Sequence, residues 1–200
     1  MARPAERSGR LQGIQLWVAL PDADRRAEPW FTHHADLPIV ALGTATARVI
    51  MGSYGGATSD ADVYTRLMAA EVTIPVGHDV RLPLEPSFEH GILALSGGLT
   101  VDGTEVPRGS MMVFDPGRPE AVVTAPAGGR VLLIGGEPFE EELVMWWNFV
   151  ARSHEEIVKV REDWEAGRVF GEVRGYPGDR LAAPPMPSVR LRPRPRMRPE

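Results

Sequence analysis

Three side chains in the middle of the chain, Glu85, His90 and Glu120, are of the types that bind iron or manganese. They lie in a series of short apolar segments. These segments are separated by glycines typical of turns, such as Gly97 and Gly117. Imidazole and carboxylate groups hold such an ion when neighbouring strands point them at one place and leave positions open for substrate or dioxygen. One hypothesis is therefore a metal site inside a small β-barrel.

Several other chemistries are excluded by the composition. The chain has no cysteine, so it has no disulfide, thiolate ligand or cysteine nucleophile, which fits a reducing cytoplasm. No nucleophile elbow or phosphate-binding glycine motif is present. The net charge of −5 argues against a broad nucleic-acid-binding surface. With no secretory signal and no apolar run near the roughly 18 residues of a membrane span, we expect a cytoplasmic protein without membrane contact.

The elements that must position these side chains are short strands. The 21 glycines and 19 prolines favour many strands and turns over long helices. Apolar residues alternate from Ile14 to Leu20, which predicts a strand over residues 13–20. Residues 21–38 are expected to form an irregular connection, and closely spaced strand-like segments follow from residue 39 onward. This density of strands is typical of a β-sandwich or β-barrel.

One helix is predicted near the C-terminus, over residues 154–166. Ser153 is a suitable N-cap, and Glu156 completes a capping box three residues later. Glu155 and Lys159 are spaced to form an ion pair on the exposed side. The apolar stripe that should pack against the rest of the protein consists of Ile157, Val160 and Trp164.

Two flanking segments have distinctive compositions. Residues 145–150 contain two tryptophans and a phenylalanine, which we expect to pack in the core or at a domain seam, with the wall of a pocket as the alternative. Residues 184–200 are rich in proline and arginine and are expected to be a disordered tail.

The order and spacing of several blocks resemble the pirin family of bicupins. The resemblance extends from residue 11 to residue 187, and the blocks that carry it are residues 13–31, 63–84, 91–103, 135–164 and 168–176. Pirins are two cupin barrels in tandem, so the resemblance implies a mainly β fold: a cupin double-stranded β-helix, or jelly-roll barrel, with one C-terminal helix. The first pirin domain resembles a metal-dependent dioxygenase with an iron site. Members are described as nuclear cofactors in animals and as quercetin-oxidising enzymes or metabolic regulators in bacteria.

The chain departs from the family pattern at its start. The blocks H-P-H-x-G-F-E and H-S-E, which precede the segment resembling residues 13–20 in family members, do not occur here. Residues 1–20 therefore resemble a remnant of the first cupin that contains its last strand, residues 21–38 a linker, and residues 39–183 the whole C-terminal cupin. The iron ligands of the family cannot be placed on any residue of this sequence, so we expect a late start codon in the gene model or a truncated family member.

The second barrel could in principle hold a metal of its own. Cupin ligands come from two motifs, one with two histidines and a glutamate, the other with a histidine that follows a proline and a glycine. Aligned with the second motif, Glu120 takes the histidine position. Aligned with the first, His90 takes the glutamate position, Glu85 the second histidine and Pro83 the first. Three of the four positions thus carry possible ligands for Fe or Mn, and their head groups should converge if the site exists.

Because proline cannot be a ligand, we favour a cupin scaffold without metal or other cofactor and assign no catalytic residue. Such a chain would act by protein interaction or be a truncated family member. The alternative is an Fe-dependent dioxygenase of the quercetin 2,3-dioxygenase type that uses Glu85, His90 and Glu120. The orphan strand at residues 13–20 must repack on the second barrel, pair with another chain or stay exposed, so we expect a protein partner or self-association.

Overall fold

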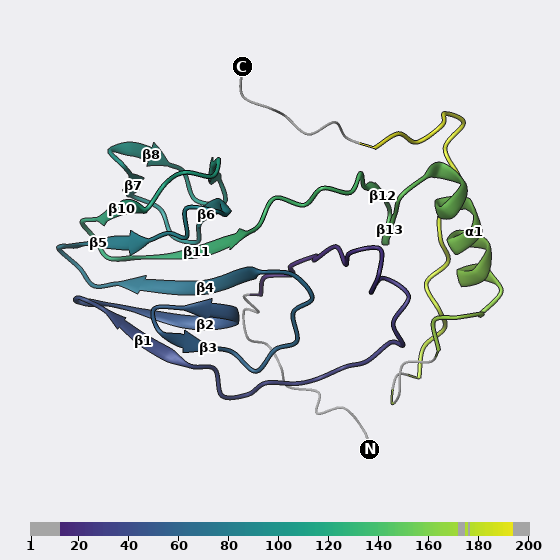
Figure 1. Ribbon diagram of the computed structural model, residues 1–200, viewed down its shortest axis with the longest axis horizontal. Coiled ribbons are helices and arrows are strands. Elements are labelled where there is room, and N and C mark those ends of the chain that lie inside the picture. Colours follow the sequence, from purple (N-terminus) through teal and green to yellow (C-terminus); the bar gives the residue numbers. More distant parts are fainter. Residues whose placement is uncertain (1–12, 172–174, 176, 194–200) are drawn as a thin grey trace.

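The regular elements of the described residues are strands apart from one helix, as the sequence predicts. The computed structural model, drawn in Figure 1, describes residues 13–171, 175 and 177–193. Within these residues no helix is long and apolar enough to cross a membrane. The elements in chain order are β1 (Ile39–Leu42), β2 (Ala45–Tyr54), β3 (Ala57–Thr58), β4 (Leu67–Ile74), β5 (His78–Pro83), β6 (Glu89–Ala94), β7 (Leu99–Val101), β8 (Thr104–Val106), β9 (Met111–Phe114), β10 (Glu120–Ala125), β11 (Gly129–Gly136), β12 (Val144–Trp146), β13 (Phe149–Ala151) and α1 (His154–Glu165).

Two antiparallel sheets enclose one hydrophobic core. The larger sheet has the order β1-β2-β4-β11-β6-β9, with β3 paired to β2, and the smaller sheet has the order β5-β10-β7-β8. Side chains of both sheets belong to the same buried cluster, so the sheets face each other across it. This arrangement fits the predicted cupin jelly roll.

Strands of the two sheets send alternate side chains into this core, as the two-residue period of a strand requires. On β10, Ala121, Val123 and Ala125 are buried in the cluster while the residues between them are partly exposed. On β6, Ile92 and Ala94 point the same way. The other face of the larger sheet we call the outer face.

A β-bulge in β2 changes which of its residues face the core. The register with β4 shifts between Val49 and Met51, so the extra residue Ile50 reverses the alternation. Val49 is buried in the core before the bulge and Tyr54 after it, whereas Met51 turns to the outer face. The backbone at Gly52, directly after the bulge, has a φ of +64°.

The C-terminal part forms a second, smaller core beside the sheets. The β12–β13 hairpin packs on α1 through Val144, Phe149 and Ile157. In Figure 1 this unit lies at one end of the molecule, and the N-terminal segment, drawn in purple, runs between it and the sheets.

The helix begins as predicted. The Ser153 hydroxyl accepts a hydrogen bond from the Glu156 backbone N–H at 3.2 Å, and Gly167 follows the last turn with a φ of +67°. The predicted pair between Glu155 and Lys159 is wrong. Glu155 instead pairs with Arg190, and Lys159 pairs with Asp163 at the next turn.

Part of the predicted tail packs beside the helix. Residues 184–193 pass along α1, where Met186 and Leu191 pack on the smaller core and the Leu191 N–H donates to Nδ1 of His154 at 3.1 Å. The disorder expected for residues 184–200 stays a prediction. Residues 194–200 of that tail, and residues 1–12 of the predicted N-terminal remnant, lie outside the described residues.

The strand predicted at residues 13–20 is also not formed. These residues lie outside every strand of the described part of the chain. Leu16 and Val18 nevertheless line one side of a cleft whose other side is the larger sheet. The predicted alternation therefore describes a segment that lies beside the sheet without joining its hydrogen-bond ladder.

Because Gly52 directly follows the bulge, we expect Gly52→Ala to destabilise the fold strongly. A Cβ there would overlap the Leu67 carbonyl oxygen, and the positive φ adds strain. We expect the free energy of unfolding to fall by about 2–4 kcal/mol. Gly43→Ala is the matched control, because Gly43 has nearly the same φ of +63° but open space around it, so strain alone should cost about 1–2 kcal/mol. Equal losses in urea unfolding would contradict this assignment.

Candidate functional site

The strands place two of the aligned ligand positions on the outside of the barrel. Glu120 on β10 lies opposite Pro83 on β5. Their neighbours Leu82 and Ala121, which are also paired, fill the core. Glu120 forms an ion pair with the exposed guanidinium of Arg81 instead of facing the interior. The side chains that do face the interior here are therefore apolar.

Glu85 lies in the exposed turn after β5. Its carboxylate accepts hydrogen bonds from the Ser87 hydroxyl at 2.9 Å and the Ser87 N–H at 3.2 Å. These bonds hold the pKa of Glu85 below its usual range, with a smaller contribution from Arg66. The carboxylate thus stabilises a turn at the end of the barrel.

His90 is the one aligned ligand that points into the barrel. It is 3% exposed, and its ring contacts Phe88 with a centroid separation of 6.0 Å. Gly135 lies opposite it on β11, where a Cβ would come within 2.6 Å of the ring. Its Nδ1 atom has no hydrogen-bond partner. Burial lowers the pKa of His90. A hydrogen bond to the Phe88 backbone and the charge of Glu85 act in the opposite direction, but the net pKa is below its usual value.

The predicted convergence of three ligands is not found. Glu85 and Glu120 make the separate surface contacts described above, and only His90 enters the core. In the described ranges, no three histidine or acidic side chains are grouped closely enough to hold a metal. Iron and manganese sites in cupins need several imidazoles and carboxylates around one point. The residues present therefore do not fit the metal that the fold family implies.

A cleft on the outer face of the larger sheet has a different chemistry. It has a volume of about 320 Å3 and lies between the sheet and residues 16–18. Its floor includes Gly91, whose missing Cβ makes room for the Met111 sulfur and Ile134. The apolar residues that line it are Leu16, Trp17, Val18, Met51, Leu67, Met68, Ala69, Met111, Val113, Ile134 and Phe139, and His90 also borders it. We call it the outer-face cleft, and residues 13–20 the strap.

The cleft is only partly covered by the strap. Trp17 and Val18 are each 45% exposed, and Val113 on the edge strand β9 is 65% exposed. Apolar surface of this kind, gathered in one place, marks a contact site more often than a random patch does.

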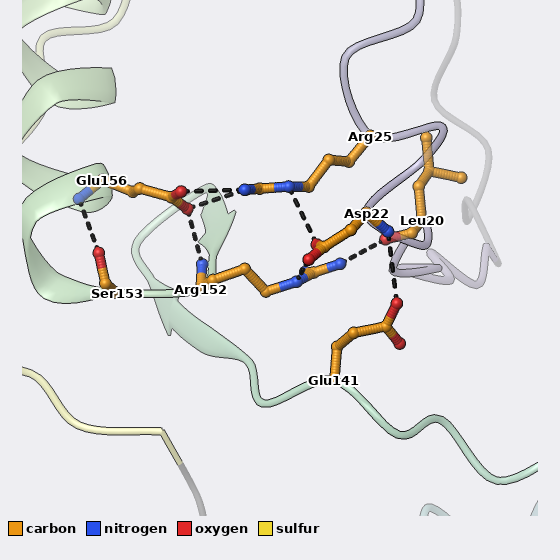
Figure 2. Close-up of polar contacts among 7 residues, drawn as sticks. All are labelled: Leu20, Asp22, Arg25, Glu141, Arg152, Ser153 and Glu156. Atoms are coloured by element: carbon orange, nitrogen blue, oxygen red, sulfur yellow. Dashed lines mark hydrogen bonds and ion pairs between the residues drawn. The ribbon is translucent and has the colours of Figure 1, made fainter.

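A group of charged side chains ties the strap end to the helical unit, as Figure 2 shows. The Arg25 guanidinium donates two hydrogen bonds to the Glu156 carboxylate, at 2.8 and 3.0 Å. The Arg152 backbone N–H donates to the same carboxylate at 2.9 Å. Glu156 therefore joins α1 to the segment of Arg25 and to the end of β13. In a regular capping box its carboxylate would accept from the Ser153 N–H, but here it accepts from the Arg152 N–H instead.

A second set of contacts continues from Arg152 to the strap. Its Nε atom donates to Asp22 at 2.8 Å, and its Nη2 atom donates to the Leu20 carbonyl at 2.6 Å (Figure 2). Its guanidinium also lies 5.5 Å from the ring centroid of Phe139, which lines the cleft. We call Asp22, Arg25, Arg152 and Glu156 the polar latch.

The latch sets the protonation of its central carboxylate. The Arg25 hydrogen bonds, followed by the bond from the Arg152 N–H, lower the pKa of Glu156 to about 2. The sequence identifies Glu156 as a cap but not its partners, because Arg25 is 131 positions away in a segment without periodicity. The local sequence contains no signal for such a pair.

The aromatic residues at 145–150 pack mainly as core, as expected. Phe149 is buried, and Trp147 and Trp164 contact it edge-on at centroid distances of 5.1 and 6.3 Å. Trp147 also lines a cavity of about 610 Å3 beside Phe170 and Arg180. For this residue, the alternative prediction of a pocket wall therefore also holds.

Comparison with known proteins places this geometry in a family. Residues 69–170 match the model of the pirin C-terminal cupin domain. A Pseudomonas aeruginosa protein provisionally named a quercetin 2,3-dioxygenase is 38% identical over 86% of this chain and 55% of its own length. A pirin-like protein of Caulobacter vibrioides is also 38% identical, over 82% of this chain and 57% of its own length.

Solved structures agree with the sequence relatives. The crystal structure of a quercetin 2,3-dioxygenase from Acinetobacter baumannii is 41% identical, with a TM-score of 0.80 over 88% of this chain and 59% of that one. The chain thus spans a little over half the length of the relatives it matches.

The buried imidazole predicts a pH dependence of stability. The folded pKa of His90 lies below the ordinary value of 6.5, so the unfolded chain takes up the proton first and stability falls as pH decreases through that value. Urea unfolding at pH 7 and pH 5 should show this loss in the wild type. His90→Phe, which keeps the ring shape without the proton, should flatten the dependence, and parallel curves for the two proteins would refute the prediction.

Removing the charge of the Glu156 carboxylate should lower the stability of the protein at neutral pH. Since the folded pKa of Glu156 is about 2, its contribution is complete above the ordinary pKa of 4.5 and disappears as pH falls from there toward 2. At pH 7, Glu156→Gln should lower the free energy of unfolding by about 1 kcal/mol after allowance for solvent screening. The adjacent Glu155→Gln removes an ion pair to Arg190 instead and should cost less. Similar losses for both, measured by chemical unfolding, would show that the latch adds nothing.

Proposed function

The chain belongs to the pirin family, and from that premise we propose that it is a metal-free cupin domain that acts through protein contacts. The observation that carries the proposal is the direction of the side chains at the aligned ligand positions. Leu82 and Ala121 face the core where ligands would be needed, while Glu120 faces solvent. One buried imidazole cannot by itself hold an iron or manganese ion.

The contact surface in this proposal is the outer face of the larger sheet. Its cleft is apolar, and Met111 and Val113 remain 48% and 65% exposed on the edge strand β9. Protein interfaces are centred on such apolar groups with a polar rim. The rim here is provided by Glu89 and Glu137, which border the cleft.

A second candidate function is that of a dioxygenase of the quercetin 2,3-dioxygenase type, which the names of two relatives favour. Those relatives are longer, since this chain spans 55–59% of them. The dioxygenase activity in their names refers to the whole, longer proteins. Of the aligned ligand positions in this chain, only His90 has a side chain in the core. We therefore rank this candidate second.

Metal loading separates the two functions. The purified chain is incubated with Fe2+ or Mn2+, desalted and examined by elemental analysis and by oxidation of quercetin, beside a full-length relative as the active reference. We expect far less than one metal per chain and no oxidation above buffer. The His90→Ala and Glu120→Ala variants should leave the metal content unchanged. Near-stoichiometric metal that either substitution removes would favour the dioxygenase.

A further inference from the structure

The C-terminal unit contains a second cavity, which shares no described lining residue with the outer-face cleft. It has a volume of about 610 Å3, inside the range of about 300–1,000 Å3 that is usual for small-molecule sites. It lies between the turn of the β12–β13 hairpin, the C-terminal end of α1 and residues 178–181. Its walls carry aromatic rings and its rim carries charges, a composition that suits a ligand site.

Four aromatic rings form one contiguous group at this cavity. Trp147 contacts Phe149 and Trp164 edge-on, at centroid distances of 5.1 and 5.8 Å. Phe170 stacks on Phe149 at 6.1 Å and contacts Trp164 edge-on at 5.5 Å. All four residues line the cavity, and Phe170 is still 37% exposed. This group, which we call the aromatic box, therefore offers ring faces and edges to a further aromatic ring.

Two residues in a strained backbone conformation position the aromatic box. The described residues include three non-glycine positions with a positive φ: Asp102, Trp147 and Val169. Trp147, with a φ of +50°, lies in the two-residue turn of the β12–β13 hairpin, where glycine or asparagine is usual. Val169, with a φ of +73°, directly precedes Phe170. Bulky and β-branched residues rarely adopt this conformation, and strain of this kind is concentrated at functional sites.

Arg180 places a positive charge at the edge of the aromatic box. Its guanidinium lies 4.8 Å from the Trp164 ring centroid. It donates hydrogen bonds to the Trp164 carbonyl at 3.0 Å and to the Gly171 carbonyl at 3.2 Å. These contacts hold the guanidinium in place and leave its other N–H groups available. A guanidinium fixed in this way loses little freedom when it binds a carboxylate.

Asp179 adds a negative charge to the lining of the same cavity. Both Asp179 and Arg180 are exposed, and within the described residues neither forms an ion pair. By contrast, Arg168 in the same unit pairs with Asp163 at 2.8 Å. The cavity thus presents one negative and one positive group whose charges are not neutralised by each other or by a neighbour.

We propose that this cavity binds a free aromatic α-amino acid as its zwitterion, with the ring in the aromatic box, the carboxylate on Arg180 and the ammonium group on Asp179. Each of the three parts of such a ligand meets a group of matching chemistry, and both charged contacts are charge-assisted hydrogen bonds. A ring with only one charge leaves one of the two protein charges without a partner. The site is separate from the contact surface of the proposed function, and the inference does not depend on that function.

Calorimetric titration of the full-length chain with three related probes tests this assignment. Naphthylalanine carries the ring and both charges, naphthylpropionate lacks the ammonium group, and naphthylethylamine lacks the carboxylate. The variants Arg180→Gln and Asp179→Asn each remove one charge from the cavity. Arg192→Gln and Asp115→Asn are the matched controls, because both residues are exposed and neither lines the cavity. Asp179→Asn keeps the test decisive if the loss of the Arg180 hydrogen bonds prevents folding.

We expect the wild type and both controls to bind naphthylalanine about fivefold more tightly than either probe with a single charge, the effect of one exposed charge pair. Asp179→Asn should remove the preference over naphthylpropionate, and Arg180→Gln should remove the preference over naphthylethylamine. Phe170→Ala should weaken the binding of all three probes by a similar factor. The inference would be overturned if the folded wild type showed no saturable binding of naphthylalanine, or if the charge variants left its preferences unchanged.

Discussion

The two-residue period of paired strands is the constraint on which the rest of this structure depends. Once β5 and β10 pair with Pro83 opposite Glu120, Leu82 and Ala121 must face the core, and no adjustment of side chains can bring Glu120 inside. The same period on β6 places His90 in the core, where Gly135 makes room for its ring. The interior is therefore mostly apolar, with the His90 imidazole and the Tyr54 hydroxyl as buried polar groups, and the aligned carboxylates lie outside it.

The outer face follows from the same rule together with one exception. The bulge at Ile50 turns Met51 toward the outer face, where it joins Met111 and other apolar side chains in the cleft. A face of this composition needs a cover, and the strap supplies part of one. The latch centred on Glu156 then couples the strap to the helical unit, so the N-terminal segment, the end of the β12–β13 hairpin and α1 meet at one place.

Features with local causes were predictable from the sequence, whereas those that depend on pairing were not. The helix was located through Ser153 and its apolar stripe, because caps and periodicity act within a few residues. The metal hypothesis stays a prediction that this geometry does not favour, because motif spacing counts residues but does not reveal strand phase, which puts Glu120 outside. The strand at 13–20 was predicted from alternation, but forming a ladder requires a partner edge that sequence does not reveal. Arg25 was missed because its partner is 131 positions away.

The strap borders an apolar cleft on the outer face, and nuclear Overhauser contacts of Trp17 test this most directly. In the wild-type chain at neutral pH, the Trp17 indole protons should show contacts to methyl groups of the cleft, such as those of Met111, Val113 and Ile134. A Trp17→Phe spectrum assigns the indole signals. An indole that contacts none of these methyl groups and behaves as a solvated side chain would contradict the account.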